Sequence, residues 1–297
     1  MKTLTKLSFL AACLTTALSV QAQSLLSDFS SSSGWGVSST LLGTGSALTI
    51  DGGVGSYTSA NTISFAAMRY NGVVGSYTSD WSVRMDVNFG APSVIFTGGV
   101  AQFLNVGLMV TRSDITPSLG SGEPDFNGFL IESSLYHNGS GGYNRDMRPV
   151  VFAPGSAVDD DIRQADGPVN SGASTFSAVQ ISFNSVTKQL FASFDADGAA
   201  NDYDFTAISS LTADASTWGM TGANTFSIYA YGVSGFDGDE EDTGPGPTIS
   251  SADLVTIDNL YGSGLTAIPE PSTYAALAGA LALGLAVWRR RQRATTV

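Results

Sequence analysis

Apolar and polar side chains alternate along several short stretches in the middle of this chain. The clearest stretch is 81–89, where Trp, Val, Met, Val and Phe occupy every second position. The same spacing recurs in five further segments, namely 106–110, 179–183, 190–194, 226–230 and 255–257. Alternation of this kind is typical of strands with one buried face. No central stretch sustains a helical period, so the pattern predicts β-structure with little helix.

Turn signals separate these stretches. The chain of 297 residues contains 34 glycines, and charged residues make up only 13% of it. The segment "NSVTK" between two alternating stretches is typical of a hairpin connection. Many short strands with turns between them favour an all-β fold, an antiparallel two-sheet sandwich or jelly roll. We expect one such domain over residues 23–267.

The first residues have the features of a secretory signal peptide. Two lysines precede the mostly apolar run 7–20, and small residues lead to a cleavage site after Ala22. A signal peptide over 1–22 implies the export machinery and a signal peptidase as partners. A buried first helix is the alternative. The residues before Cys13 also resemble a lipidation site, but the apolar run continues past that cysteine, which favours cleavage after Ala22. Cys13 is the only cysteine, so the mature chain would have no disulfide.

The last residues combine an apolar run with a basic cluster. Residues 274–288 carry no charge, and as a helix they would span about 22 Å, somewhat less than a typical hydrocarbon core of about 30 Å. Including 272 and 273 brings a transmembrane helix over 272–288 within reach of a thin membrane. The arginines that follow are Arg289, Arg290, Arg291 and Arg293. Their charge belongs on the cytoplasmic side, which leaves the body outside.

A short proline motif precedes the apolar run. The order Pro269-Glu270-Pro271, apolar segment and arginine cluster resembles the PEP-CTERM sorting signal of bacterial surface proteins, also known as an ice-binding-protein C-terminal motif. We assign it to residues 268–293. The resemblance implies a sorting enzyme of the exosortase type as partner. It also implies a precursor in the inner membrane that is processed near the motif and delivered to the cell surface, outer envelope or extracellular matrix.

The body is strongly acidic. Between residues 23 and 268 there are seven basic and 25 acidic side chains, so the net charge of this part is −18. Such a surface excludes nucleic acid as a partner on electrostatic grounds. Divalent cations and neutral or cationic polymers, extracellular polysaccharide among them, stay compatible with it.

One acidic cluster has the side chains of a calcium site. Its members are Asp195, Asp197, Asn201, Asp202 and Asp204. Closely spaced oxygen ligands suit calcium, although the spacing does not match an EF-hand. A solvated loop is the alternative for this cluster. For the other two acidic runs, 159–161 and 237–242, the solvated loop is the favoured interpretation.

The segment "VQISFNSVTKQLFASFDADG" resembles adjacent strands of concanavalin-like or laminin-G-like sandwiches, where a second strand ends in Asp-x-Asp-Gly. The resemblance covers these 20 residues and favours that sandwich over an immunoglobulin-like one.

Catalytic signals are weak. His137 is the only histidine, and its surroundings predict an exposed loop. Glycosidases on the concanavalin sandwich carry a motif resembling Glu-x-Asp-x-x-Glu, but here Gly128 stands where the second glutamate belongs, and Pro124 disfavours a central strand. We therefore expect no enzyme. The expected function is a surface or matrix protein that binds glycan or is structural. The alternative is a secreted polysaccharide-acting hydrolase with an unrecognised site.

Overall fold

The computed structural model describes most of the body, with several gaps. The described residues are 23–42, 46–60, 64–90, 101–120, 123–138, 143–154, 176–198, 203–236, 248–249, 255–268 and 283. Within them the regular structure is almost entirely β-strand, and one short 3₁₀ helix, η3 (Ala215–Trp218), lies between two strands.

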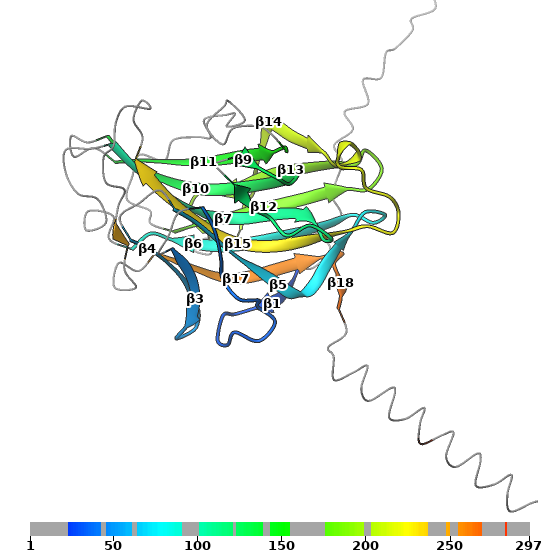
Figure 1. The fold of residues 1–297 in the computed structure, drawn as a ribbon, viewed down its shortest axis with the longest axis horizontal. Helices are drawn as coiled ribbons and strands as arrows, with labels where there is room; N and C mark the ends of the chain where they lie inside the picture. The colour runs from blue at the N-terminus through cyan, green and yellow to red at the C-terminus, as the bar shows by residue number, and fades with distance from the viewer. Residues whose placement is uncertain are drawn as a thin grey trace, which may run out of the picture.

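Two antiparallel sheets form the body (Figure 1). Sheet A has the order β14-β13-β12-β6-β17-β4-β16, with β1 beside β17 and β3 beside β4. Its strands are β14 (Thr206–Asp214), β13 (Gln189–Asp195), β12 (Phe176–Asn184), β6 (Trp81–Asn88), β17 (Thr256–Ser263), β4 (Val54–Ala60), β16 (Thr248–Ile249), β1 (Ser24–Ser27) and β3 (Ala47–Asp51).

Sheet B has the order β11-β10-β7-β15-β5-β18, with β2 beside β5. Its strands are β11 (Tyr143–Phe152), β10 (Gly128–Asn138), β7 (Ala101–Arg112), β15 (Thr225–Phe236), β5 (Ser64–Ser76), β18 (Thr266–Ala267) and β2 (Ser39–Leu42). A separate pair, β8 (Leu119–Gly120) and β9 (Glu123–Pro124), completes the described strands.

The main core lies between the two sheets. Alternate residues of β6 point inward, and Trp81 packs against Phe183 of β12 and Phe226 of β15 with ring centroids 5.7 and 5.2 Å away. All three side chains are buried. Strands from opposite sheets therefore meet through aromatic contacts, which hold the sandwich together by burying apolar surface.

A second hydrophobic cluster lies on the outer side of sheet B. Leu130 belongs to it, whereas its neighbours Phe129 and Ile131 belong to the main core, so β10 is buried on both faces. Leu119 of β8 and Phe126, just after β9, pack into this second cluster. The β8–β9 segment thus covers part of the outer side of sheet B.

The predicted all-β, antiparallel two-sheet sandwich is confirmed. The alternating stretch at 81–89 forms β6, and "NSVTK" connects β12 to β13, with Asn184 paired to Gln189. Pro124 lies in a strand of two residues, as its chemistry suggested. Among the residues described, no helix is long and apolar enough to cross a membrane. The predicted helix 272–288 lies outside those residues except for Leu283.

Candidate functional site

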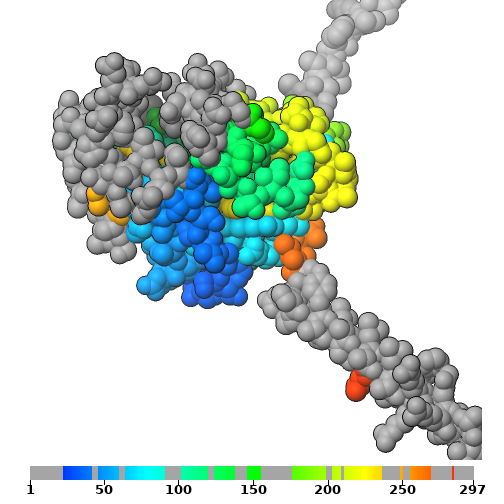
Figure 2. Space-filling view, viewed as in Figure 1, coloured from blue at the N-terminus to red at the C-terminus, as the bar shows by residue number. Residues whose placement is uncertain are grey.

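The last strand of the body ends immediately before the predicted sorting motif. β18 pairs with β5, and the backbone N–H of Ile268 donates to the carbonyl of Gly72 at 3.0 Å. The turn before β18 requires Gly264, which has φ +66°, and whose added Cβ would lie 2.2 Å from the carbonyl oxygen of Asp80. The chain is therefore held against the sandwich up to residue 268. In Figure 2 its orange atoms lie at the surface of the body.

The motif residues Pro269, Glu270 and Pro271 and the arginines Arg289, Arg290, Arg291 and Arg293 lie outside the described residues. The signal peptide over 1–22 lies outside them as well. Their predicted roles stay predictions.

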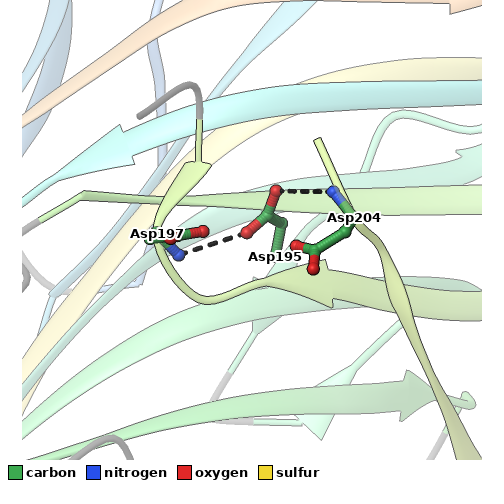
Figure 3. Close-up of side chains that lie close together, drawn as sticks. All are labelled: Asp195, Asp197 and Asp204. Carbon is green, nitrogen blue, oxygen red and sulfur yellow. Dashed lines mark hydrogen bonds between the residues drawn. The ribbon is translucent and has the colours of Figure 1, made fainter. Parts of the chain in front are cut away.

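The structure gathers three of the five predicted metal ligands. Asp195 ends β13, and its carboxylate lies between Asp197 and Asp204 (Figure 3). One ligand atom from each of the three lies within 4.8 Å of the others. Asn201 and Asp202 lie outside the described residues.

The carboxylate of Asp195 organises the loop that joins β13 to β14. Its Oδ1 accepts the backbone N–H groups of Asp197 and Gly198 at 3.1 and 3.2 Å, and its Oδ2 accepts that of Asp204 at 3.0 Å. Asp195 is buried, Asp197 is partly exposed and Asp204 is exposed. Burial, followed by the neighbouring Asp197, raises the pKa of Asp195. A bound cation would favour the ionised form of Asp195 and offset the repulsion between these three neighbouring carboxyl groups.

A second group of side chains lies on the outer face of sheet A, beside this loop. The guanidinium of Arg84 on β6 lies between two tyrosines, with its Cζ 3.5 Å from the ring centroid of Tyr203 and 4.2 Å from that of Tyr261. The ring of Phe205 is parallel to that of Tyr203, with an interplanar angle of 5° and centroids 5.9 Å apart. All three rings are partly exposed. We call Tyr203 and Phe205 the aromatic platform.

Hydrogen bonds hold this platform in place. The hydroxyl of Tyr203 donates to Asp86, 3.0 and 2.9 Å from its two carboxylate oxygens, and Asn259 Nδ2 donates to Oδ2 at 3.1 Å. Burial raises the pKa of Asp86, although these hydrogen bonds and Arg84 act in the opposite direction. Desolvation and the nearby Asp86 raise the pKa of Tyr203 well above its usual range, so its hydroxyl stays a donor.

A third polar group lies on the outer side of sheet B. Glu132 on β10 accepts from Asn105 Nδ2 at 2.8 Å and from the hydroxyl of Tyr231 at 2.9 Å. Ser134 donates to Asn105 Oδ1 at 2.7 Å, and Arg148 donates to the hydroxyl oxygen of Ser134 at 2.6 Å. We call these five residues the Glu132 network; it crosses β11, β10, β7 and β15.

Close backbone packing shapes the Glu132 network. Gly107 lies between Glu132 and Tyr231 in the registers of β7 with β10 and β15. A Cβ at Gly107 would lie 2.0 Å from the carbonyl oxygen of Ile131, so only glycine fits there. Beside the network lies a cavity of about 30 Å³. Its lining is largely apolar and consists of Phe65, Leu130, Glu132, Val150, Phe152, Tyr231 and Val233.

Sequence patterns missed both polar groups. The prediction that His137 lies in an exposed loop is wrong, because His137 belongs to β10 and is only 2% exposed. Strand β10 is buried on both faces, so its polar residues interrupt the alternation that signals a strand. Tyr203 lies just before β14 and contacts Arg84 of β6, a strand distant in sequence, so no local motif predicts that contact.

The comparison with protein families finds one match. Residues 267–291 match the PEP-CTERM protein-sorting motif. The chain therefore carries this motif directly after its last described strand, as the sequence predicted. No curated protein matches the chain.

Solved structures similar to the body include lectin domains. Peanut lectin is 14% identical, with 79% of this chain and 99% of that chain covered and a TM-score of 0.40. The VIP36 exoplasmic/lumenal domain, in a Ca²⁺/Man3GlcNAc-bound form, is 13% identical, with coverage of 84% and 91% and a TM-score of 0.43. The Emp46p carbohydrate recognition domain is 12% identical, with coverage of 77% and 88% and a TM-score of 0.40. At such TM-scores these likenesses have no bearing on what this chain binds.

Proposed function

We propose that this chain is an exported protein, sorted by its PEP-CTERM motif, that displays a β-sandwich at the cell surface. The motif match at 267–291 carries the proposal. The structure supplies a physical context, because β18 and the hydrogen bond of Ile268 lie directly before Pro269. Two prolines there disfavour helix and β-ladder pairing, which keeps the backbone accessible to a sorting enzyme.

In this proposal the precursor spans the inner membrane once. The arginines Arg289, Arg290, Arg291 and Arg293 stay cytoplasmic, and Glu270 lies just outside, within reach of an exosortase-type enzyme. Processing near the motif then releases the body to the cell surface, outer envelope or extracellular matrix.

Glu270→Ala tests the sorting step. The substitution leaves the apolar run and the arginines unchanged, so insertion should persist, while processing should fail. Fractionation followed by immunoblotting should then show the variant in the membrane at precursor length. Ser272→Ala serves as the control and should be processed like the wild type. Equal processing of wild type and Glu270→Ala would contradict a sorting role and leave a plain anchor.

For the body we propose binding to extracellular polysaccharide at the surface. The aromatic platform supports this role, because partly exposed rings beside hydrogen-bonding groups suit sugar recognition. A purely structural role is the alternative within the same class. The hydrolase alternative gains no support from Glu132, the buried carboxylate beside the cavity, because both of its oxygens already accept hydrogen bonds.

We further propose that calcium stabilises the loop after β13 through Asp195, Asp197 and Asp204, with Asn201 and Asp202 as candidate ligands. Oxygen ligands of high negative charge favour calcium. The fit is supported by the spacing of the three carboxylates within 4.8 Å, and by the capacity of a carboxylate to accept more bonds than the three backbone N–H groups that reach Asp195.

A calcium titration tests this cofactor. A ligand that binds only the native state raises its stability, by about 2.7 kcal/mol at a hundred times the dissociation constant. Millimolar calcium should therefore raise the melting temperature of the full chain in detergent, and a chelator should reverse the rise. Asp197→Asn should weaken the response, whereas Asp28→Asn, on an exposed turn, should not. An unchanged melting temperature in the wild type would count against calcium.

A further inference from the structure

We propose that the aromatic platform is the floor of a binding site for a neutral polysaccharide chain. The inference rests on the proposed polysaccharide binding and gives it a place on the molecule and a ligand class. Tyr203 and Phe205 come from the segment before β14, and they lie over Arg84 of β6 on the outer face of sheet A.

The distances show how the two rings are arranged. Arg84 Cζ lies 3.5 Å from the centroid of Tyr203 but 6.0 Å from that of Phe205. The rings are parallel within 5°, and their centroids are 5.9 Å apart. If one ring lay on top of the other, Phe205 would be much farther from Arg84. Phe205 is therefore displaced sideways from Tyr203, so that the two parallel rings offer neighbouring aromatic surfaces.

One face of Tyr203 packs against the guanidinium of Arg84 on β6. A sugar would therefore stack on the face of that ring that Arg84 does not cover. Both rings are partly exposed, as a surface that receives a ligand must be.

The platform is also held rigidly. The Tyr203 hydroxyl bonds both oxygens of Asp86, and the backbone N–H of Asp204, between the two rings, bonds Asp195. The guanidinium of Arg84 packs against one face of the Tyr203 ring in a cation–π contact, which restrains that ring. Rings that are already ordered lose little entropy when a ligand binds.

The chemistry around the platform selects the ligand. The flat apolar face of a pyranose ring complements two adjacent aromatic rings, and its hydroxyls can bond polar groups at the rim. The exposed Asp204 lies between the two rings in sequence, while Asp86 and Asp258 form a cross-strand pair beneath. Together with a net charge of −18 over 23–268, these carboxylates repel a polyanion. The favoured ligand is therefore an uncharged polysaccharide.

Binding of the detergent-solubilised full chain to insoluble cellulose and to chitin tests the proposal, with alginate as the acidic counterpart. The wild type should bind at least one of the two neutral polymers. Phe205→Ala should weaken that binding about ten-fold or more while the melting temperature stays close to that of the wild type. Phe205→Leu keeps the apolar volume but lacks the flat ring, and it should lose binding as well.

Phe176→Ala provides the matched control. Phe176 is a 54% exposed phenyl ring on β12 of the same sheet, and its removal should leave binding unchanged. If wild-type binding survives both Phe205 substitutions, the platform is not the site, although polysaccharide binding itself stands. If alginate is preferred, the ligand class is wrong. If no polymer binds, both this inference and the proposed polysaccharide binding fail, while the sorting proposal is untouched.

Discussion

The outer face of each sheet carries a buried carboxyl group, and the surroundings of these two groups differ. On sheet B, Glu132 is 3% exposed and its partners Asn105 and Tyr231 are both 0% exposed. On sheet A, Asp86 is 8% exposed, but its partners Tyr203 and Asn259 are both partly exposed. The first carboxylate is thus enclosed among groups without access to water. The second lies under rings that reach the solvent.

This difference predicts that losing a carboxylate acceptor costs more stability on sheet B than on sheet A. Burial makes the hydrogen bonds from Asn105 and Tyr231 to Glu132 costly to lose, because both donors are 0% exposed. Half-exposed partners can rehydrate, so the outer face of sheet A tolerates change and can exchange water for a ligand.

The largest effect is expected for Glu132→Ala. It removes the carboxylate that accepts from Asn105 and Tyr231 and opens a void beside the existing cavity. We expect a loss of about 3 kcal/mol of unfolding free energy, equivalent to a fall of roughly 6–12 °C in melting temperature for a domain of this size. Thermal denaturation of the full chain in detergent measures it.

Asp86→Ala is the matched comparison on sheet A. Tyr203 and Asn259 can turn to water when their acceptor is removed, so the loss should be about 1 kcal/mol. Equal losses at Glu132 and Asp86 would abolish the distinction between the two faces.

A smaller effect concerns pH and Asp86→Asn. Burial raises the pKa of Asp86 above the ordinary 3.8, so the folded chain holds this proton more tightly than the unfolded chain does. The resulting stabilisation is complete below the unfolded pKa and is lost as the pH rises through the folded pKa. The asparagine keeps an acceptor for Tyr203 but does not ionise. The melting temperature of the variant should therefore rise relative to that of the wild type as the pH increases from 4 to 7. If the difference between the two melting temperatures does not change with pH, the raised pKa of Asp86 is contradicted.

The alternating stretches predicted from the sequence lie in β6, β7, β12, β13, β15 and β17, whereas the strand around His137, β10, was missed. Strand β6 shows clean alternation because Ser82, Arg84 and Asn88 face outward and are only half-buried. Strand β10 lies between two hydrophobic clusters, so Leu130 and Ile131 are both apolar while Glu132 and Ser134 are polar but buried. Local periodicity cannot distinguish a buried polar residue from an exposed one, because burial is set by segments distant in sequence.

The candidate sites divide in the same way. The sorting motif is a local signal, and a family match supports it at 267–291. Asp195, Asp197 and Asp204 are close in sequence, so their proximity was predictable. The contact of Arg84 with Tyr203 joins residues more than a hundred positions apart, so no local pattern predicts it.

The hydrogen bond between Ile268 and Gly72 holds the chain against the sandwich up to the residue before the Pro269-Glu270-Pro271 motif. Three extended residues, 269–271, reach at most about 10 Å. Any attachment made within them would hold the edge formed by β5 and β18 close to the attachment point, and the sandwich could swing only within a narrow cone. So short an attachment would place the same edge of the sandwich next to the attachment point in every copy. Neighbouring copies would then share one orientation.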